Sequence, residues 1–109
     1  MAGRKRAIMA LADTLLIDLG THARRSSVVA YLDDNKNTVA ALADMDMTEA
    51  KYIIGLGYMR RMNVQSLLAV PQVAGLRVTT ASKLKLERLY RKELRSFLAS
   101  SPSLGQDLA

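Results

Sequence analysis

The spacing of apolar residues along the chain predicts helices and no sheet. From Lys5 to Leu19, apolar side chains recur three or four positions apart, which places them on one face of a helix. Gly20 follows directly, and glycine is the residue that most readily ends a helix in the left-handed conformation. Only residues 76–78 are expected to be extended. We therefore predict an all-α fold class, a small bundle of short helices.

Five further helical segments follow the first, separated by polar or glycine-containing turns. Thr21, Thr48 and Thr80 stand where a hydroxyl can cap the first turn of a helix. Gly55 and Gly57 are expected to end or kink the helix that contains them, because glycine is a poor helix former. The predicted helices after the first span residues 21–32, 38–44, 48–57, 63–70 and 81–98.

The last predicted helix separates its apolar and basic side chains onto opposite faces. At 100° per residue, its apolar side chains fall within about 120° of one another. The apolar arc contains Leu86, Tyr90, Leu94, Phe97 and Leu98. The opposite arc contains Lys85, Arg88, Arg91, Lys92 and Arg95. We expect the first face to pack on the protein and the second to present its cations to a partner, whereas Lys83 lies off the basic arc.

Charge is distributed unevenly along the 109 residues, whose net charge is +6. Residues 33–50 contain five acidic residues and one basic residue, whereas residues 51–98 contain ten basic and two acidic residues. Lysine and arginine neutralise phosphates with release of counterions, and a helix fits the major groove. Double-stranded DNA is therefore the partner predicted for the basic arc. A solvated helix face and an acidic protein or membrane surface are the alternatives.

The composition removes several classes of protein from consideration. With no Cys and one His, the chain is not expected to hold a thiolate zinc site, a disulfide scaffold or a multi-histidine centre. Asp33, Asn35 and Asn37 imitate the start of a calcium loop, but Thr38 and Asp44 stand where that loop needs Gly and Glu. The longest uncharged run, residues 62–76, has 15 residues and is shorter than the roughly 20 that a bilayer requires. We expect no enzymatic activity, no metal, no cofactor and a cytoplasmic location.

Residues 38–57 contain the small and apolar side chains with which two helices cross in a helix-turn-helix unit. However, Asp44 stands in the turn where glycine is favoured, and Asp46 and Glu49 would repel phosphate. An ordinary buried helix pair is therefore the preferred interpretation. An autonomous helix-turn-helix repressor of a phage or plasmid is the alternative function, and a helical adaptor that binds no DNA is a third.

Four parts of the chain together resemble one known family. They are Leu15-Leu16, the stretch Arg25–Leu32, Asn35 and the stretch Leu42–Met47. The last stretch is similar to the Leu-Ala-x-Leu-Thr-Leu step between two helices of the FlhD family, the smaller subunit of the bacterial flagellar master regulator. The resemblance runs without gaps from Leu11 to Met59.

The resemblance implies an intertwined, all-helical homodimer that joins a zinc-binding FlhC-like subunit in a hetero-oligomeric transcription activator. It also implies that the partner carries the metal and much of the DNA contact, with RNA polymerase as a further partner. The chain departs from the family in two ways. It has no cysteine near Arg61, where the flagellar subunit forms an intersubunit disulfide, and the similarity is lost after Asn63. The loss of similarity after Asn63 and the basic last helix indicate a relative on a conjugative or other mobile element, where family members switch on transfer genes.

A homodimer is also expected from the helices themselves. Short helices with aliphatic faces and almost no aromatic residues bury little apolar surface in a monomer of this length. We expect the shared core to be lined by Leu11, Leu15, Leu16, Val28 and Val29. The domain organisation that follows is a helical dimerisation core at 1–79, a basic helix at 80–98 and a disordered tail at 99–109.

Overall fold

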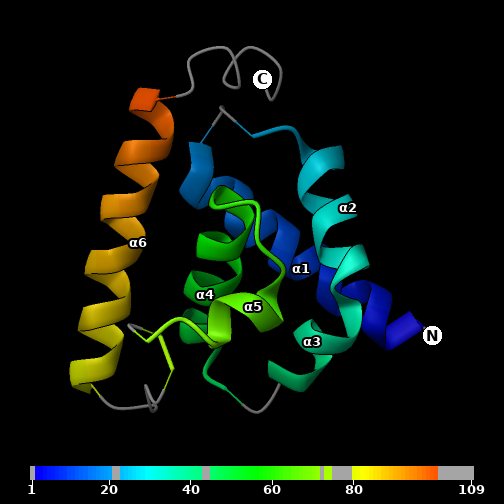
Figure 1. Ribbon diagram of the computed structural model, residues 1–109. Coiled ribbons are helices and arrows are strands. Elements are labelled where there is room, and N and C mark those ends of the chain that lie inside the picture. The colour runs from blue at the N-terminus through cyan, green and yellow to red at the C-terminus, as the bar shows by residue number, and fades with distance from the viewer. Residues whose placement is uncertain (1, 21–22, 43–44, 72, 75–79, 101–109) are drawn as a thin grey trace.

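A computed structural model shows six α-helices and no strand in the described part of the chain, which confirms the all-α prediction (Figure 1). It describes residues 2–20, 23–42, 45–71, 73–74 and 80–100. The helices are α1 (Ala2–Leu19), α2 (Arg25–Asp34), α3 (Lys36–Ala41), α4 (Met47–Met59), α5 (Val64–Leu68) and α6 (Thr80–Ser100). The predictions for residues 76–78 and for the tail from residue 101 lie outside these ranges. Residues 99 and 100, predicted to begin the tail, belong to α6, and so does Thr80, predicted to cap it.

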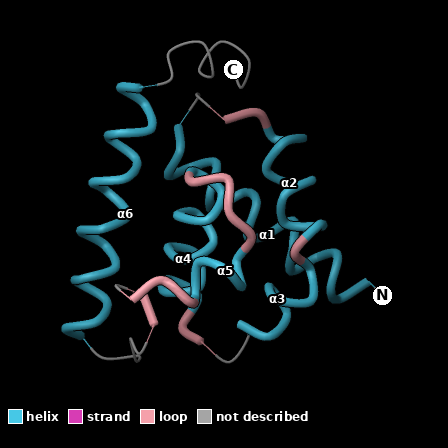
Figure 2. The backbone as a smooth tube through the Cα atoms, in the orientation of Figure 1, coloured by secondary structure: helices cyan, strands magenta, loops and turns pink. Residues whose placement is uncertain are grey.

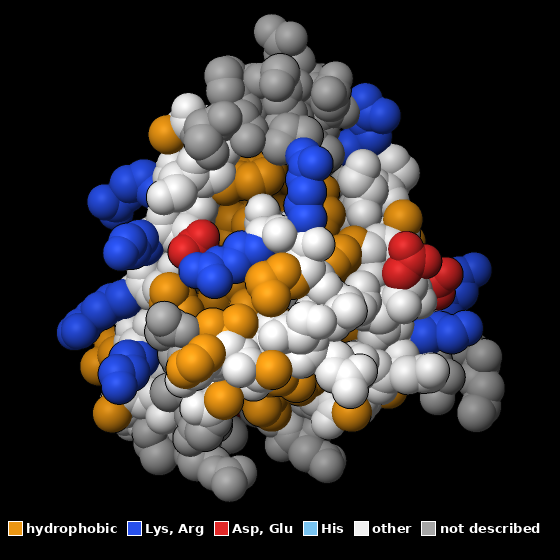
Figure 3. Space-filling view, viewed as in Figure 1, with side chains coloured by type: hydrophobic (Ala, Val, Ile, Leu, Met, Phe, Trp, Pro, Cys, Tyr) orange, Lys and Arg blue, Asp and Glu red, His pale blue; other side chains and the backbone are white. Residues whose placement is uncertain are grey.

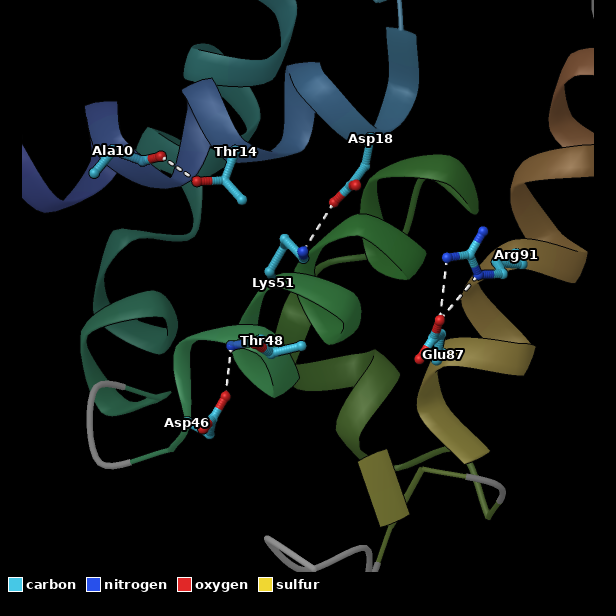
Figure 4. A network of polar contacts seen from close by, with 8 residues as sticks. All are labelled: Ala10, Thr14, Asp18, Asp46, Thr48, Lys51, Glu87 and Arg91. Atoms are coloured by element: carbon cyan, nitrogen blue, oxygen red, sulfur yellow. Dashed lines mark hydrogen bonds and ion pairs between the residues drawn. The ribbon is translucent and has the colours of Figure 1, made fainter. Parts of the chain in front are cut away.

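The helix ends follow local chemistry, although several of them differ from the predicted ends. Gly20 has a φ of 70°, the left-handed conformation expected after α1. The predicted start of the second helix at Thr21, itself outside the described ranges, is wrong, because Arg24 is the extended N-cap residue of α2. The predicted Thr48 cap is also wrong. Asp46 caps α4 instead, and its carboxylate accepts a 2.8 Å hydrogen bond from the backbone N–H of Thr48 (Figure 4).

The turn expected at residues 33–37 is shorter than predicted, because α2 continues to Asp34 and only Asn35 separates it from α3. The Asn35 side chain explains this sharp junction. Its Nδ2 donates to the carbonyl of Tyr31 at 2.8 Å, and its Oδ1 accepts from the N–H of Val64 at 3.4 Å. Both halves of the amide are therefore used to join α2 to the start of α5.

The two glycines of α4 serve close packing. The helix runs through Gly55 and Gly57 to Met59, so neither glycine ends it. A Cβ at Gly55 would lie 2.2 Å from Cε2 of Tyr90 on α6, and a Cβ at Gly57 would lie 2.4 Å from the hydroxyl of Tyr31 on α2. Glycine is required at these positions because two tyrosines approach the backbone of α4 from neighbouring helices.

The middle of the bundle is formed by α4 and α5, with α6 on one side and α2 on the other (Figure 2). Ile53, Ile54 and Leu56 of α4 are fully buried, and every helix contributes apolar side chains to the same core. Leu86 and Tyr90 of α6 belong to it. The segments 1–79 and 80–98 that the sequence analysis separated therefore share one core.

The residues expected in a dimer interface are largely covered within one chain. Leu11, Leu15 and Val28 are buried in the chain's own core, and Leu16 and Val29 are partly buried against it. Much of the apolar surface that was expected to be buried between two copies is therefore already buried within one chain. Homodimerisation itself stays a prediction.

The carboxyl group of Glu49 is buried in the first turn of α4. The residue is 1% exposed, and its Oε1 has no hydrogen-bond partner among the described residues. Burial raises the pKa of Glu49; the positive charge of Lys83 opposes this effect, and the negative charge of Asp46 adds to it. The folded protein therefore disfavours the ionised form of this side chain.

Glu49→Gln is expected to stabilise the protein at pH 7 by on the order of 1 kcal/mol, because glutamine removes the cost of burying or protonating this carboxyl group. The folded pKa lies above the ordinary value of 4.5. Wild-type stability therefore falls as pH rises from the ordinary pKa through the folded pKa, whereas the stability of the variant lacks this dependence. Urea unfolding midpoints should differ most at pH 7 and least near pH 4. A difference that is the same at both pH values would contradict this assignment.

Candidate nucleic-acid interface

One face of α6 packs against α4, as the apolar arc predicted. Leu86 and Tyr90 are buried, and Leu94 and Phe97 pack partly buried against the same core. The ring of Tyr90 contacts that of Tyr52, with 4.9 Å between the ring centroids and 58° between the ring planes. This face attaches the helix to the body of the protein, so the opposite face points away from it.

Two ion pairs join α6 to the ends of α4. Near the start of α6, Nζ of Lys83 lies 3.1 Å from Oδ2 of Asp46, and near its other end Glu93 pairs with Arg60. The hydrogen bond from Lys83, with a second from the N–H of Thr48, holds the pKa of Asp46 below its ordinary value. Partly exposed pairs of this kind contribute little stability. The pairing of Lys83 with Asp46 agrees with the prediction that Lys83 lies off the basic arc, on the side of α6 that faces the protein.

All five side chains of the predicted basic arc are exposed. They are Lys85, Arg88, Arg91, Lys92 and Arg95. Arg91 also pairs with Glu87 one turn earlier, with Nη2 and Nε of the arginine 3.1 and 3.2 Å from the same carboxylate oxygen (Figure 4). The other four make no ion pair within the described ranges. We call Lys85, Arg88, Lys92 and Arg95 the basic face.

Figure 3 shows Lys and Arg side chains along the edge of the molecule formed by α6, and further basic side chains across the face that is turned to the viewer. Arg60 and Arg61 follow directly after α4 and are both exposed. The carboxylate of Glu93 neutralises Arg60, whereas the guanidinium of Arg61 has no ion-pair partner among the residues that the structure describes. The surface around α6 is therefore predominantly positive.

The alternative recognition helix, predicted at residues 48–57, lies in α4 at the centre of the core. Glu49 is buried, and Tyr52 is half-buried against α6. Lys51 is also used within the protein, since its Nζ lies 3.2 Å from Oδ2 of Asp18 on α1 (Figure 4) and 4.8 Å from the centre of the Tyr52 ring. This arrangement favours the buried helix pair over a helix that is free to enter a DNA groove.

A pocket of about 290 Å³, which was not predicted from the sequence, lies at the C-terminal end of α4. The rings of Tyr31, Tyr58 and Phe97 line it, with Arg61 beside them. These residues come from α2, α4, α6 and the turn after α4, so no local motif marks the pocket. The one available signal was composition: the chain has four Tyr and one Phe, and three of these five rings converge here.

No group of three or more His, Cys, Asp or Glu side chains that could hold a metal ion is found in the described ranges. Within the same ranges, no helix has both the length and the apolar character needed to cross a membrane. Comparisons of the chain with family models, curated proteins and solved structures find no match in any of the three. The FlhD resemblance therefore stays an interpretation of the sequence pattern, and function has to be argued from the surface of α6.

Proposed function

We propose that this chain is a DNA-binding subunit of a bacterial transcription activator related to the FlhD family. It acts on promoter DNA together with a zinc-binding FlhC-like partner, and its targets are flagellar-like or conjugative-transfer genes. The observation that carries the proposal is the basic face of α6, whose four exposed cations have no ion-pair partner in the described structure. A face that served only as a solvated surface would be expected to intersperse acids among such cations.

The spacing of the basic face suits a phosphate backbone. Its residues stand at i, i+3, i+7 and i+10, which places them on one side of α6 over about 15 Å of helix. Duplex DNA carries one negative charge per roughly 1.7 Å of its axis, so several phosphates lie within this reach. Such contacts position a protein on DNA without reading its sequence. The proposal therefore assigns sequence recognition to the partner, and it assigns the metal to the partner because this chain has no Cys.

The proposed complex contains a homodimer of this chain. Leu11, Leu15 and Val28 of the predicted interface are buried within one chain, whereas Leu16 and Val29 are only partly buried and are available, together with exposed apolar side chains, for the contact. Large exposed apolar side chains in the described ranges are Ile17, Met47 and Leu84. Sedimentation velocity at nanomolar concentration is expected to show a dimer. A folded monomer under those conditions would remove the homodimer from the proposal.

The functional test is a gel shift with the promoter DNA of adjacent genes and with random DNA of equal length. The chain alone is expected to bind both weakly and alike, whereas the chain copurified with its native partner should bind the promoter tightly and specifically. Tight, specific binding by the chain alone would instead favour the autonomous repressor. Absence of binding in both cases would favour the helical adaptor.

A further inference from the structure

The pocket at the end of α4 is a second potential binding site. Its volume of about 290 Å³ is at the lower end of the range for small-molecule sites. The rings of Tyr31 and Tyr58 meet edge to face, with 5.4 Å between centroids and 79° between planes, and the ring of Phe97 contributes to the lining from α6. No acidic side chain lines the pocket. Its walls are therefore aromatic and its charge is positive.

The polar groups of the pocket are largely satisfied within the protein. The Tyr31 hydroxyl donates a hydrogen bond to the carbonyl of Met62, and burial raises the pKa of Tyr31 to about 12, so that this proton is retained. Asn35 bonds to backbone groups on both sides, and Asn63 caps α5 by accepting from a backbone N–H. These bonds fix the shape of the pocket and leave its ring surfaces to a ligand.

Arg61 is the charged group at the pocket and has an unusual backbone. Its φ is +57°, the left-handed region that favours glycine, directly after the C-cap residue Arg60. The N–H of Met62 closes the helix end by donating to the carbonyl of Gly57 at 2.8 Å. An arginine here costs about 1 kcal/mol relative to glycine. Its exposed guanidinium has no ion-pair partner among the described residues that would compensate this cost.

We propose that this pocket binds a small aromatic anion, with its ring system against Tyr58 and Phe97 and its carboxylate or phosphate paired with Arg61. The proposal goes beyond the DNA-binding function and does not depend on it. Aromatic rings pack favourably on one another, by about 0.5–1.5 kcal/mol beyond the area that they bury. A guanidinium forms paired hydrogen bonds with carboxylate or phosphate. Arg61 also favours an anionic ligand over a cationic one, because its guanidinium would repel a cation that the aromatic rings alone could attract.

The test is an NMR titration of the ¹⁵N-labelled chain with two anions and their neutral counterparts. The phosphate probe is adenosine monophosphate with adenosine as its counterpart, and the carboxylate probe is indole-3-acetate with indole. At least one anion is expected to shift the amides of Arg61, Met62 and Asn63 with a sub-millimolar Kd. Its neutral counterpart should bind at least about tenfold more weakly, because it lacks the charge-assisted pair. The pair of probes identifies which anionic group is preferred.

Arg61→Gly provides the decisive variant, because glycine suits the left-handed backbone and the variant is expected to melt at the same or a higher temperature. Its affinity for the anion should fall to that of the neutral counterpart. Arg88→Ala removes the same charge from the basic face and should leave the affinity unchanged. This control separates the pocket from the DNA surface, so that either proposal can fail alone.

Three outcomes would overturn the pocket proposal. The first is that neither anion shifts these amides at about 5 mM, a concentration that would reveal even a millimolar Kd. The second is that Arg61→Gly binds the anion as tightly as the wild type does. The third is that the bare anion binds as tightly as the aromatic anion that shifts these amides (inorganic phosphate against adenosine monophosphate, or acetate against indole-3-acetate), because the aromatic walls would then contribute nothing.

Discussion

Replacing Leu15 with aspartate is expected to unfold the chain at neutral pH. The side chain of Leu15 is 0% exposed in the core of the single chain. Removing a buried leucine costs about 2–5 kcal/mol, and an unpaired buried carboxylate adds several kcal/mol. Their sum is comparable with the whole stability of a small domain, about 5–15 kcal/mol. Circular dichroism should show loss of helix at every protein concentration, since the burial of Leu15 does not depend on a second copy.

Ile17→Asp is the matched control for this prediction. Ile17 lies two residues further along α1 and is 80% exposed, so the same substitution on the same helix should leave the monomer folded. If Leu15→Asp folds normally, then the described packing of α1 is wrong. If Ile17→Asp keeps its helix content but loses the dimer, then the homodimer contact of the proposed function involves this part of α1.

The combined replacement of Lys85, Arg88, Lys92 and Arg95 with alanine is expected to abolish most of the salt-dependent DNA affinity. Four lost phosphate contacts should lower the slope of log K against log salt by about 3 to 4, because each contact contributes about 0.9. Promoter and random DNA should be affected alike, since these contacts read no sequence. Fluorescence anisotropy of the purified complex over a series of salt concentrations measures both quantities. Helix content should be unchanged because all four side chains are exposed.

A second quadruple alanine variant distinguishes a local interface from net charge. Lys5, Arg6, Arg24 and Lys36 are exposed and lie on α1, at the start of α2 and on α3. Their replacement lowers the net charge by the same four units as replacement of the basic face. The proposal expects a much smaller change in slope for this control. If the salt slope falls equally in both variants, then overall charge alone attracts DNA. If the slope does not fall in the α6 variant, then its basic face is only a solvated surface.

Amphipathic periodicity allowed the surface of α6 to be predicted from the sequence. The helical repeat is a local property, so the positions of Leu86 and Tyr90 determine which face is buried, and the positions of Arg88 and Arg95 then follow on the other side. The position of Lys83 off the basic arc was derived in the same way. What periodicity could not supply was its partner, Asp46, which is distant in the sequence.

Helix ends were predicted less well, because several residues compete for each cap. Asp46 and Thr48 both offer an oxygen to the start of α4, and the carboxylate of Asp46 has that role in the structure. Gly55 and Gly57 look like helix breakers in isolation. Only the approach of two tyrosine side chains, from α2 and from α6, shows that these glycines are sites of close packing inside α4.

By itself, the sequence determined the all-α class, the region of each helix and the two faces of α6, because each depends on residues a few positions apart. The tertiary structure alone decided which apolar residues a single chain buries, so that Leu11, Leu15 and Val28 belong to its own core. It also decided that the rings of Tyr31, Tyr58 and Phe97 meet beside Arg61. The physical reason is that such contacts join residues distant along the chain, and only the packing of α2, α4 and α6 against one another brings them together.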